Sequence, residues 1–107
     1  MSVKEIDVEL AFQMQSKGNL LIDVREQHEW DVAHATGATH FPKSKLPKFE
    51  KNFSAKNKPY ILICQRGVRS KIAADFLVDV GYTNIYSVTG GFSDWEEAKL
   101  PVTTETS

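Results

Sequence analysis

One stretch near the middle of the chain, residues 60–70, limits the possible folds more than any other part of the sequence. It begins with four apolar residues, 60–63, and continues through Cys64, the only cysteine, into a polar and cationic segment. A short apolar run that ends in polar residues is typical of a buried strand in a parallel sheet. The apolar residues that follow Ser70 at helical spacing predict an amphipathic helix. We therefore expect Cys64 to lie where a strand ends and a loop enters the next helix.

This location favours anion chemistry at the cysteine. Ligands of open α/β sheets bind at the carboxyl ends of the strands, where free backbone N–H groups of a loop and of a helix start attract negative charge. Arg66 and Arg69 add two guanidinium groups, which favour the thiolate form of Cys64. Gly67 permits a tight loop, and Ser70 is expected to cap the following helix. The predicted anion-binding loop comprises Gln65, Arg66, Gly67, Val68, Arg69 and Ser70.

The single cysteine also limits the kind of site. A lone cysteine is more often an inert buried residue than a nucleophile, but the neighbouring arginines and the helix start favour a nucleophile here. One cysteine excludes an intramolecular disulfide and a cysteine-rich metal site, and it fits a reducing compartment. We expect no metal site in this chain.

Strand patterns alternate with helical patterns along the chain, which predicts one α/β domain over residues 1–107 with a parallel sheet. Strands are expected at 19–24, 39–41, 60–63 and 85–88. Helices are expected at 7–17 with Asp7 as the cap, at 26–32, at 70–80 and after Gly91. Segment 43–58 is less regular and should bury one helical side made of Leu46, Phe49 and Phe53. The polar end, at about 103–107, is expected to be a frayed tail.

Charge is distributed unevenly, although the net charge is only −1. Residues 43–58 contain six lysines and one acid, whereas residues 1–31 and 72–107 are acidic. The basic segment predicts attraction of small anions or of an acidic protein partner, because it leads directly into the strand before Cys64. A nucleic-acid surface would need interleaved arginines, exposed aromatic residues and a pI well above 6.3, so we expect none. The apolar runs are too short for a membrane span and the first ten residues lack a signal-peptide core, so we expect a cytoplasmic protein without membrane contact.

Asp23, near the end of the strand at 19–24, has two interpretations. It can be a structural acid that caps the next turn or pairs with an arginine, or it can support the loop by accepting hydrogen bonds from loop N–H groups. The first is favoured, because a second anion near the sulfur would disfavour the thiolate of Cys64. Arg25 is expected to form an ion pair with Glu26 or Glu29.

Four motifs, in order, resemble those of the rhodanese (sulfurtransferase) family. Residues 64–70 read Cys-x-x-Gly-x-Arg-Ser, which resembles the family's active-site loop, and residues 21–26 resemble its LIDVRE strand. Residues 34–42 are similar to the family's GHIxGAxNIP, and residues 90–95 to its GGxxxW. The resemblance covers roughly residues 4–102. It implies a single rhodanese-like domain with a small, mostly parallel sheet of about five strands and helices on both faces.

Three positions depart from the family pattern. Ala33 stands where the family usually has glycine, Phe92 where it has tryptophan, and Lys99 where it has glycine. We expect these changes to affect a local turn, packing or a helix cap, and not the chemistry. His34 and His40 are candidates for general bases, but transfer of a sulfane sulfur needs none. Both are therefore expected to be structural residues with hydrogen-bonded rings.

Loop length separates two possible chemistries. Cysteine phosphatases and cysteine-dependent arsenate reductases use Cys-x5-Arg, a loop for a tetrahedral oxyanion, whereas Cys64 to Arg69 is Cys-x4-Arg. The shorter loop resembles that of sulfurtransferases. The arsenate reductases also generally need a further cysteine, which this chain lacks. We therefore expect sulfur chemistry.

The resemblance implies a thiosulfate sulfurtransferase that works by double displacement. Cys64 would take the outer sulfur of thiosulfate or a similar anion, Arg66 and Arg69 would neutralise the donor, and cyanide or a thiol would accept the sulfur. No metal or organic cofactor is needed. Two alternatives stay open: a persulfide carrier that serves a specific acidic or thiol protein, and a non-catalytic binding module. Retention of Cys64, Gly67 and Arg69 argues against the module.

Overall fold

The computed structural model describes residues 3–104 of the chain. The helices are α1 Val8–Ser16, α2 Gln27–Val32, the 3-10 helix η1 Lys43–Lys48, α3 Phe49–Asn52, α4 Val68–Asp79 and α5 Gly91–Glu97. The strands are β1 Lys4–Ile6, β2 Leu20–Asp23, β3 Ala33–Ala35, β4 Thr39–His40, β5 Tyr60–Ile63, β6 Ile85–Val88 and β7 Val102–Thr104. No helix within residues 3–104 is long and apolar enough to cross a bilayer.

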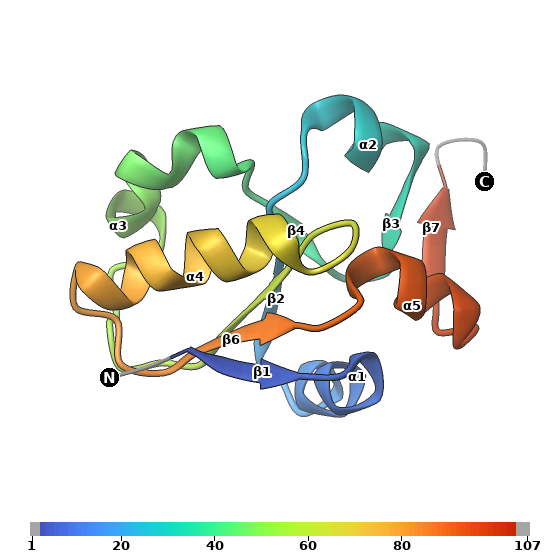
Figure 1. Ribbon diagram of the computed structural model, residues 1–107, viewed down its shortest axis with the longest axis horizontal. Coiled ribbons are helices and arrows are strands. Elements are labelled where there is room, and N and C mark those ends of the chain that lie inside the picture. The colour runs from blue at the N-terminus through green and yellow to red at the C-terminus, as the bar shows by residue number, and fades with distance from the viewer. Residues whose placement is uncertain (1–2, 105–107) are drawn as a thin grey trace.

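A five-stranded parallel sheet forms the centre of the molecule, in the order β1-β6-β5-β2-β4 (Figure 1). The strand before Cys64, β5, lies in the middle, and Leu62 is paired with Ile22 of β2 and Ser87 of β6. All four residues of β5 are buried, as expected for an apolar strand covered on both faces. The prediction of a mostly parallel sheet of about five strands is confirmed. Because the strands are parallel, the residues that follow β2, β5 and β6 meet at one edge.

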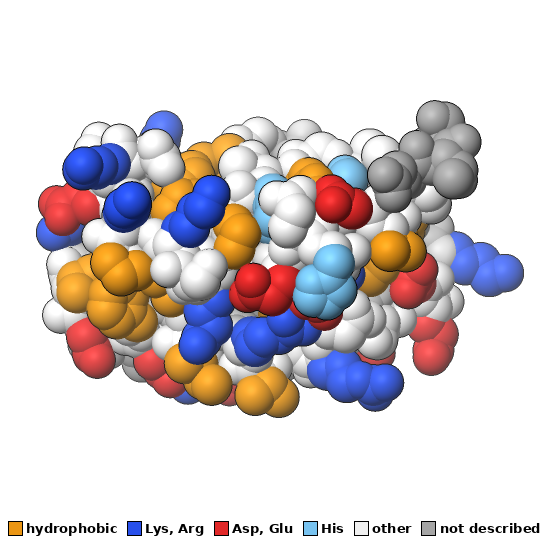
Figure 2. All heavy atoms as spheres, turned by 90° about the horizontal axis from the view of Figure 1, so that it is seen from above, with side chains coloured by type: hydrophobic (Ala, Val, Ile, Leu, Met, Phe, Trp, Pro, Cys, Tyr) orange, Lys and Arg blue, Asp and Glu red, His pale blue; other side chains and the backbone are white. Residues whose placement is uncertain are grey.

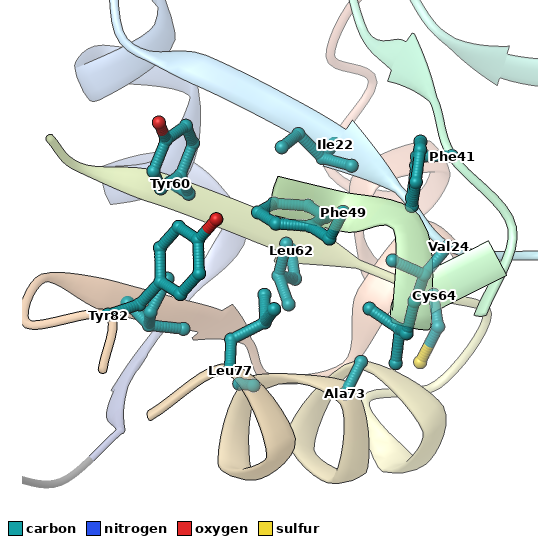
Figure 3. Close-up of a cluster of buried hydrophobic side chains, with 13 residues drawn as sticks. Ile22, Val24, Phe41, Phe49, Tyr60, Leu62, Cys64, Ala73, Leu77 and Tyr82 are labelled. Carbon is teal, nitrogen blue, oxygen red and sulfur yellow. The ribbon is translucent and has the colours of Figure 1, made fainter. Parts of the chain in front are cut away.

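Helices cover both faces of the sheet, as predicted. Alternate residues of a strand point to opposite faces, so Leu62 packs into one core while Ile61 and Ile63 pack into the other. Leu77 of α4 shares the first core, which Figure 3 shows with Cys64 at one end. Trp95 of α5 shares the second core, where it packs this helix against the sheet as the sequence predicts. The two cores therefore enclose β5 and position the residue that follows it.

Most predicted elements lie where the sequence places them. Asp7 accepts a hydrogen bond from the N–H of Leu10 and caps α1, which is the predicted cap. Segment 43–58 is only partly helical, as η1 and α3. Phe49 is nevertheless buried among aromatic rings, as expected for the apolar side of this segment. Strand β1 has no counterpart in the sequence prediction, because its burial pattern gives only Ile6 to the core.

The predicted apolar face of helix α4 is only partly buried. The sequence pattern groups Ile72, Phe76 and Val80 with Ala73 and Leu77, but the structure buries only the last two and exposes the other three. The small side chains on the buried face allow the helix to lie close to the sheet, which leaves the longer ones outside the contact. The predicted helix is therefore confirmed, with Ala73 and Leu77 on its buried side.

The predicted frayed tail is wrong for residues 103 and 104. Strand β7 pairs in antiparallel fashion with β3, with Thr103 opposite His34 and Thr104 opposite Ala33. The Oγ1 atoms of Thr36 and Thr103 lie 2.8 Å apart in a hydrogen bond. Threonine fits a strand well, and its polarity was misleading at the sequence level. The rest of the predicted tail, 105–107, lies outside the described residues.

The three departures from the family pattern have local explanations. Ala33 has an extended backbone, with φ −168° and ψ 149°, so this position has no need of glycine. Phe92 is buried beneath the guanidinium of Arg25, whose Cζ lies 4.4 Å from the ring centroid. Lys99 follows α5 with φ 61°, the one positive φ at a non-glycine residue among those described. Lysine therefore occupies a left-handed position that favours glycine.

Candidate active site

The Cys64 loop begins directly after β5 and enters α4 at Gly67. Gly67 is the N-cap of α4, with φ 99°, a left-handed conformation that glycine adopts without strain. A Cβ at this position would lie 3.2 Å from the nitrogen of Gly90 and 3.3 Å from the oxygen of Val88. Ser70 lies inside the first turn of α4, so the prediction that it caps the helix is wrong. The left-handed turn at Gly67 starts the helix at Val68, before Ser70.

Backbone N–H groups of the loop converge on the sulfur of Cys64. The N–H of Gly67 donates to Sγ at 3.1 Å, and the N–H of Ser70 donates to Sγ at 3.2 Å. The Ser70 hydroxyl lies 3.5 Å from Sγ and shares a 2.7 Å hydrogen bond with the hydroxyl of Ser87. Cys64 itself is 1% exposed. Two N–H donors at the start of a helix stabilise negative charge on a sulfur atom, so the geometry favours an anionic sulfur here.

The Gly90–Gly91 turn positions the loop from the opposite side. The N–H of Phe92 donates to the carbonyl oxygen of Cys64 at 2.7 Å, and the N–H of Ser93 donates to that of Gln65 at 3.0 Å. A Cβ on Gly91 would lie 2.3 Å from the Cys64 oxygen, which no structure tolerates without a shift. The sharp turn predicted from the two glycines therefore brings the start of α5 directly against the Cys64 loop.

The two arginines of the loop have different surroundings. Arg69 forms a bidentate ion pair with Glu29 of α2, at 2.6 Å to Oε1 and 2.8 Å to Oε2. The hydrogen bond from Arg69 lowers the pKa of Glu29 to about 2, and the same bond raises the pKa of Arg69. Arg66 is exposed and has no hydrogen bond or ion pair within residues 3–104. The charge of Arg69 is thus largely neutralised, whereas that of Arg66 is free.

A buried ion pair lies under the loop and involves Asp23. Its carboxylate accepts from Arg25 Nε at 3.0 and 3.1 Å and from the Arg25 backbone N–H at 2.9 Å. Arg25 also donates to Gln65 Oε1 at 3.1 Å and to the carbonyl oxygen of Ala33 at 2.6 Å. The arginine-pairing interpretation of Asp23 is confirmed. Among the described residues its carboxylate takes no bond from a loop N–H, so its support of the loop is indirect, through Arg25 and Gln65.

The predicted pairing of Arg25 with Glu26 or Glu29 is wrong. Arg25 pairs with Asp23 instead, and Glu29 pairs with Arg69. Sequence proximity favours the nearby acids, but α2 turns Glu29 toward the Cys64 loop, 40 residues later in the chain. Glu29 is therefore a site residue that the sequence analysis missed. One signal in the sequence could have revealed Glu29. Strands β2 and β5 end at the same edge of the sheet, and Glu29 lies on α2, the helix that follows β2.

Both candidate histidines have a hydrogen-bonded ring, as predicted. His34 Nδ1 is hydrogen-bonded to the carbonyl oxygen of Trp30 at 2.9 Å, and His40 Nε2 to that of Arg25 at 2.8 Å. The Trp30 ring stacks on both imidazoles, with centroids 3.5 Å from His34 and 4.7 Å from His40. These contacts position α2, which carries Glu29.

A pocket of about 310 Å³ opens beside the loop. Gln65 forms part of its wall and bridges two elements, because its Oε1 accepts from Arg25 and its Nε2 donates to Ser93 Oγ at 3.0 Å. The pocket is lined by Arg25, His28, Glu29, Val32, Ala33, Gln65, Phe92 and Glu96. Figure 2 shows acidic, basic and histidine side chains close together on the face of the molecule seen from above. Small polar molecules therefore have room next to the residue that follows Cys64.

Comparisons with known proteins agree with this geometry. Residues 7–98 match the family model described as rhodanese-like domain. The chain is 38% identical to thiosulfate sulfurtransferase GlpE of Haemophilus influenzae, over 97% of this chain and 98% of that protein. It is 35% identical to thiosulfate sulfurtransferase GlpE of Vibrio cholerae, over 91% and 92% of the two chains.

Solved structures agree as well. A rhodanese-related protein of Thermoplasma volcanium superposes with a TM-score of 0.80 at 30% identity, covering 94% of this chain and 97% of that one. The polysulfide-sulfur transferase homodimer of Wolinella succinogenes shares the fold, with a TM-score of 0.81 at 23% identity, covering 94% and 78%.

Proposed function

This chain belongs to the rhodanese-like domain family, and from that premise we propose that it is a thiosulfate sulfurtransferase whose nucleophile is Cys64. The observation that carries the proposal is the pair of N–H groups, from Gly67 and Ser70, aimed at the sulfur of the only cysteine. Relatives 38% and 35% identical along nearly their whole length are named for the same activity. A small-molecule sulfur donor and a small-molecule acceptor follow from the family.

In the first half-reaction the Cys64 thiolate attacks the outer sulfur of thiosulfate. A bond forms between Sγ and that sulfur, the sulfur–sulfur bond of thiosulfate breaks, and sulfite leaves with the bonding electron pair. The negative charge stays on the outer sulfur of the Cys64 persulfide. The Gly67 and Ser70 N–H groups stabilise the charged sulfur before attack. No metal or organic cofactor takes part in this step.

Arg66 is the residue best suited to attract the donor. It is exposed and unpaired among the described residues, whereas Arg69 is occupied by Glu29. A free guanidinium raises the local concentration of a dianion such as thiosulfate and stabilises departing sulfite. Arg69 then acts mainly to connect the loop to α2. This division of roles refines the expectation that both arginines bind the donor.

In the second half-reaction a nucleophile removes the outer sulfur. Cyanide attacks it, the bond to Sγ breaks, thiocyanate leaves, and the Cys64 thiolate is restored. A thiolate reacts in the same way and becomes a persulfide. The acceptor must come from outside, because the chain has no second cysteine. The free thiol of Cys64 also supports a reducing, cytoplasmic setting as part of this proposal.

The steady-state rate of thiocyanate formation from thiosulfate and cyanide tests the proposal. Cys64→Ser is expected to abolish the rate while the unfolding midpoint changes little, because serine is close to cysteine in size. Arg66→Gln is expected to raise KM for thiosulfate about tenfold with a smaller change in kcat, since the residue attracts the dianion. Lys17→Gln, directly after helix α1, serves as the matched loss of one exposed positive charge and should change neither constant. Persistent turnover by Cys64→Ser would contradict the mechanism.

A further inference from the structure

Helix α4 carries an apolar stripe that the described part of the protein does not cover. Val68, Ile72, Phe76 and Val80 are 67%, 52%, 39% and 44% exposed. The first three lie on α4, and Val80 is the residue directly after it. They are spaced four residues apart, so they follow one side of the helix. Single exposed apolar residues need no explanation, but a contiguous row of four is typical of an interaction surface.

The stripe starts at the sulfur loop. Val68 lies between Gly67 and Ser70, the two residues whose N–H groups donate to Sγ of Cys64. At its other end, Phe76 and Val80 line a small groove of about 90 Å³ together with Pro47 of η1. The stripe therefore runs from the candidate active site along α4 to the segment formed by η1 and α3.

Unpaired lysines lie on η1 and α3, the two elements that line the groove at the end of the stripe. Lys45 and Lys48 of η1 and Lys51 of α3 are exposed and have no ion-pair partner within residues 3–104. Lys45 and Lys48 line a pocket of about 350 Å³ on the other side of Pro47. Two further lysines, Lys56 and Lys71, are already paired with acids. In Figure 2 basic, hydrophobic and some acidic side chains lie together on the left of the view.

We propose that the α4 stripe and these lysines form the docking surface for an acidic protein that presents an acceptor thiol to Cys64. The inference rests on the proposed function, because it names the class of the acceptor. The stripe spans about 18 Å from Val68 to Val80, which exceeds the size of a small thiol and matches a helical segment of about three turns on a protein partner. The acids nearby are Glu50 and Asp75, each paired with a lysine, and Asp79, which has no ion-pair partner among the described residues. The three unpaired lysines outnumber it, so the net charge favours an acidic partner over a second copy of this chain.

The transfer itself balances without an oxidant. The partner's thiolate attacks the outer sulfur of the Cys64 persulfide, a new sulfur–sulfur bond forms on the partner, and the bond to Sγ breaks. The electron pair returns to Sγ as the Cys64 thiolate, and the partner leaves as a persulfide. Because Cys64 is buried, an acceptor must reach the sulfur through the loop, and a partner seated beside Val68 is placed to do so.

Three synthetic peptides of equal length with one cysteine each serve as probes. The first combines leucines with glutamates, the second has lysine at each glutamate position, and the third has serine at each leucine position. We measure how fast each peptide discharges protein that was loaded with thiosulfate and freed from excess donor, using intact mass. A serine-for-cysteine form of each peptide, labelled for fluorescence anisotropy, reports binding independently of the chemistry.

The leucine–glutamate peptide is expected to discharge the protein about tenfold faster than its lysine counterpart at low salt, and the difference should shrink as salt is added. The leucine–glutamate peptide should also discharge the protein several-fold faster than the peptide with serine at the leucine positions. Phe76→Gln and Lys48→Glu should each slow this peptide about threefold to tenfold and weaken its binding, while discharge by cyanide stays unchanged. Leu10→Gln on α1 and Lys17→Glu directly after α1 are the matched controls and should have no effect.

Equal rates and equal binding for the three peptides would overturn the docking surface while leaving sulfur transfer to cyanide intact. A dimer that sedimentation detects and Phe76→Gln abolishes would also overturn it, since the stripe would then be covered by a second copy. Failure of thiosulfate to load Cys64 would instead contradict the proposed function, and the acceptor role with it.

Discussion

The two ends of strand β5 are built in different ways. At its amino end Tyr60 lies in an aromatic cluster with Phe49 and Tyr82, with ring centroids 5.3 to 5.7 Å apart. At its carboxyl end Cys64 lies among directional hydrogen bonds from Gly67 and Ser70. Figure 3 shows both ends of this core, with the tyrosines on one side and the sulfur on the other.

We infer that the aromatic end of β5 contributes mainly to stability and the carboxyl end mainly to the chemistry. The aromatic end depends on buried area and shape, and its hydroxyl groups bond only at the rim, where Tyr60 donates to Ala55 and Tyr82 donates to Phe53. Burial raises the pKa of both phenols, so neither supplies a proton near neutral pH. At the carboxyl end, by contrast, the sulfur of Cys64 accepts hydrogen bonds from two specific N–H groups. Substitutions at the two ends should therefore have different consequences.

The largest effect is expected from Asp23→Asn at the carboxyl end. This change keeps the volume but leaves the buried guanidinium of Arg25 without its counter-ion, which costs about 3–5 kcal/mol of unfolding free energy. The same change should reduce turnover of the folded protein, because Arg25 bonds Gln65 of the loop. Urea unfolding and steady-state rates measure the two effects. The double variant Asp23→Asn, Arg25→Gln should recover part of the unfolding free energy but not the turnover rate. Full recovery of both would contradict the support of the Cys64 loop by Arg25.

At the aromatic end, the change to compare with Asp23→Asn is Phe49→Leu. Phe49 contacts Phe41, Phe53, Tyr60 and Tyr82, but leucine keeps most of the apolar volume. We expect a loss of about 1 kcal/mol in unfolding free energy with unchanged kcat and KM. A loss of activity in fully folded Phe49→Leu protein would contradict this expectation, because it would show that the aromatic end affects the sulfur site.

A smaller effect is expected from the ion pair between Glu29 and Arg69. The pair is partly exposed, so Glu29→Gln should cost about 1 kcal/mol or less. Because folding lowers the pKa of Glu29 from 4.5 to about 2, the stabilisation is fully present above pH 4.5 and disappears as the pH falls toward 2. Unfolding free energies of the wild type and Glu29→Gln should therefore converge over this acid range. A gap that persists at pH 2 would contradict this assignment.

The smallest effect is expected from Lys99→Gly, which lies far in sequence from both ends. Lys99 has φ 61°, so glycine should relieve local strain and raise the unfolding free energy by about 0.5–1 kcal/mol. Turnover should not change. Thermal unfolding measures the gain, and Lys58→Gly in the irregular segment before β5 is the matched control that should show none.

The sequence was informative where local pattern and parallel geometry suffice. The run from Tyr60 to Cys64 predicts a buried strand that ends in a loop, and parallel strands place Asp23 at the same edge. The sequence did not predict which acid pairs with which arginine, because those pairs depend on the three-dimensional arrangement of the elements. The partners of Arg25 and Arg69 depend on how α2 is oriented, which sequence spacing does not encode.

Backbone conformation explains the remaining differences. Ser70 has the chemistry of a helix cap, but the left-handed turn at Gly67 starts α4 three residues earlier. Thr103 is polar, but pairing with β3 orders it. The outer residues of α4 have the period of a core helix, and only the packing against the sheet shows which side is buried.

Whether Cys64 carries the transferred sulfur can be decided from the intact mass of the protein after treatment with thiosulfate. We expect the wild type to gain the mass of one sulfur atom and to lose it in a cyanide wash, and we expect Cys64→Ser to gain nothing. Wild-type protein that gains no sulfur, or a Cys64→Ser variant that gains as much as the wild type, would contradict this role of Cys64.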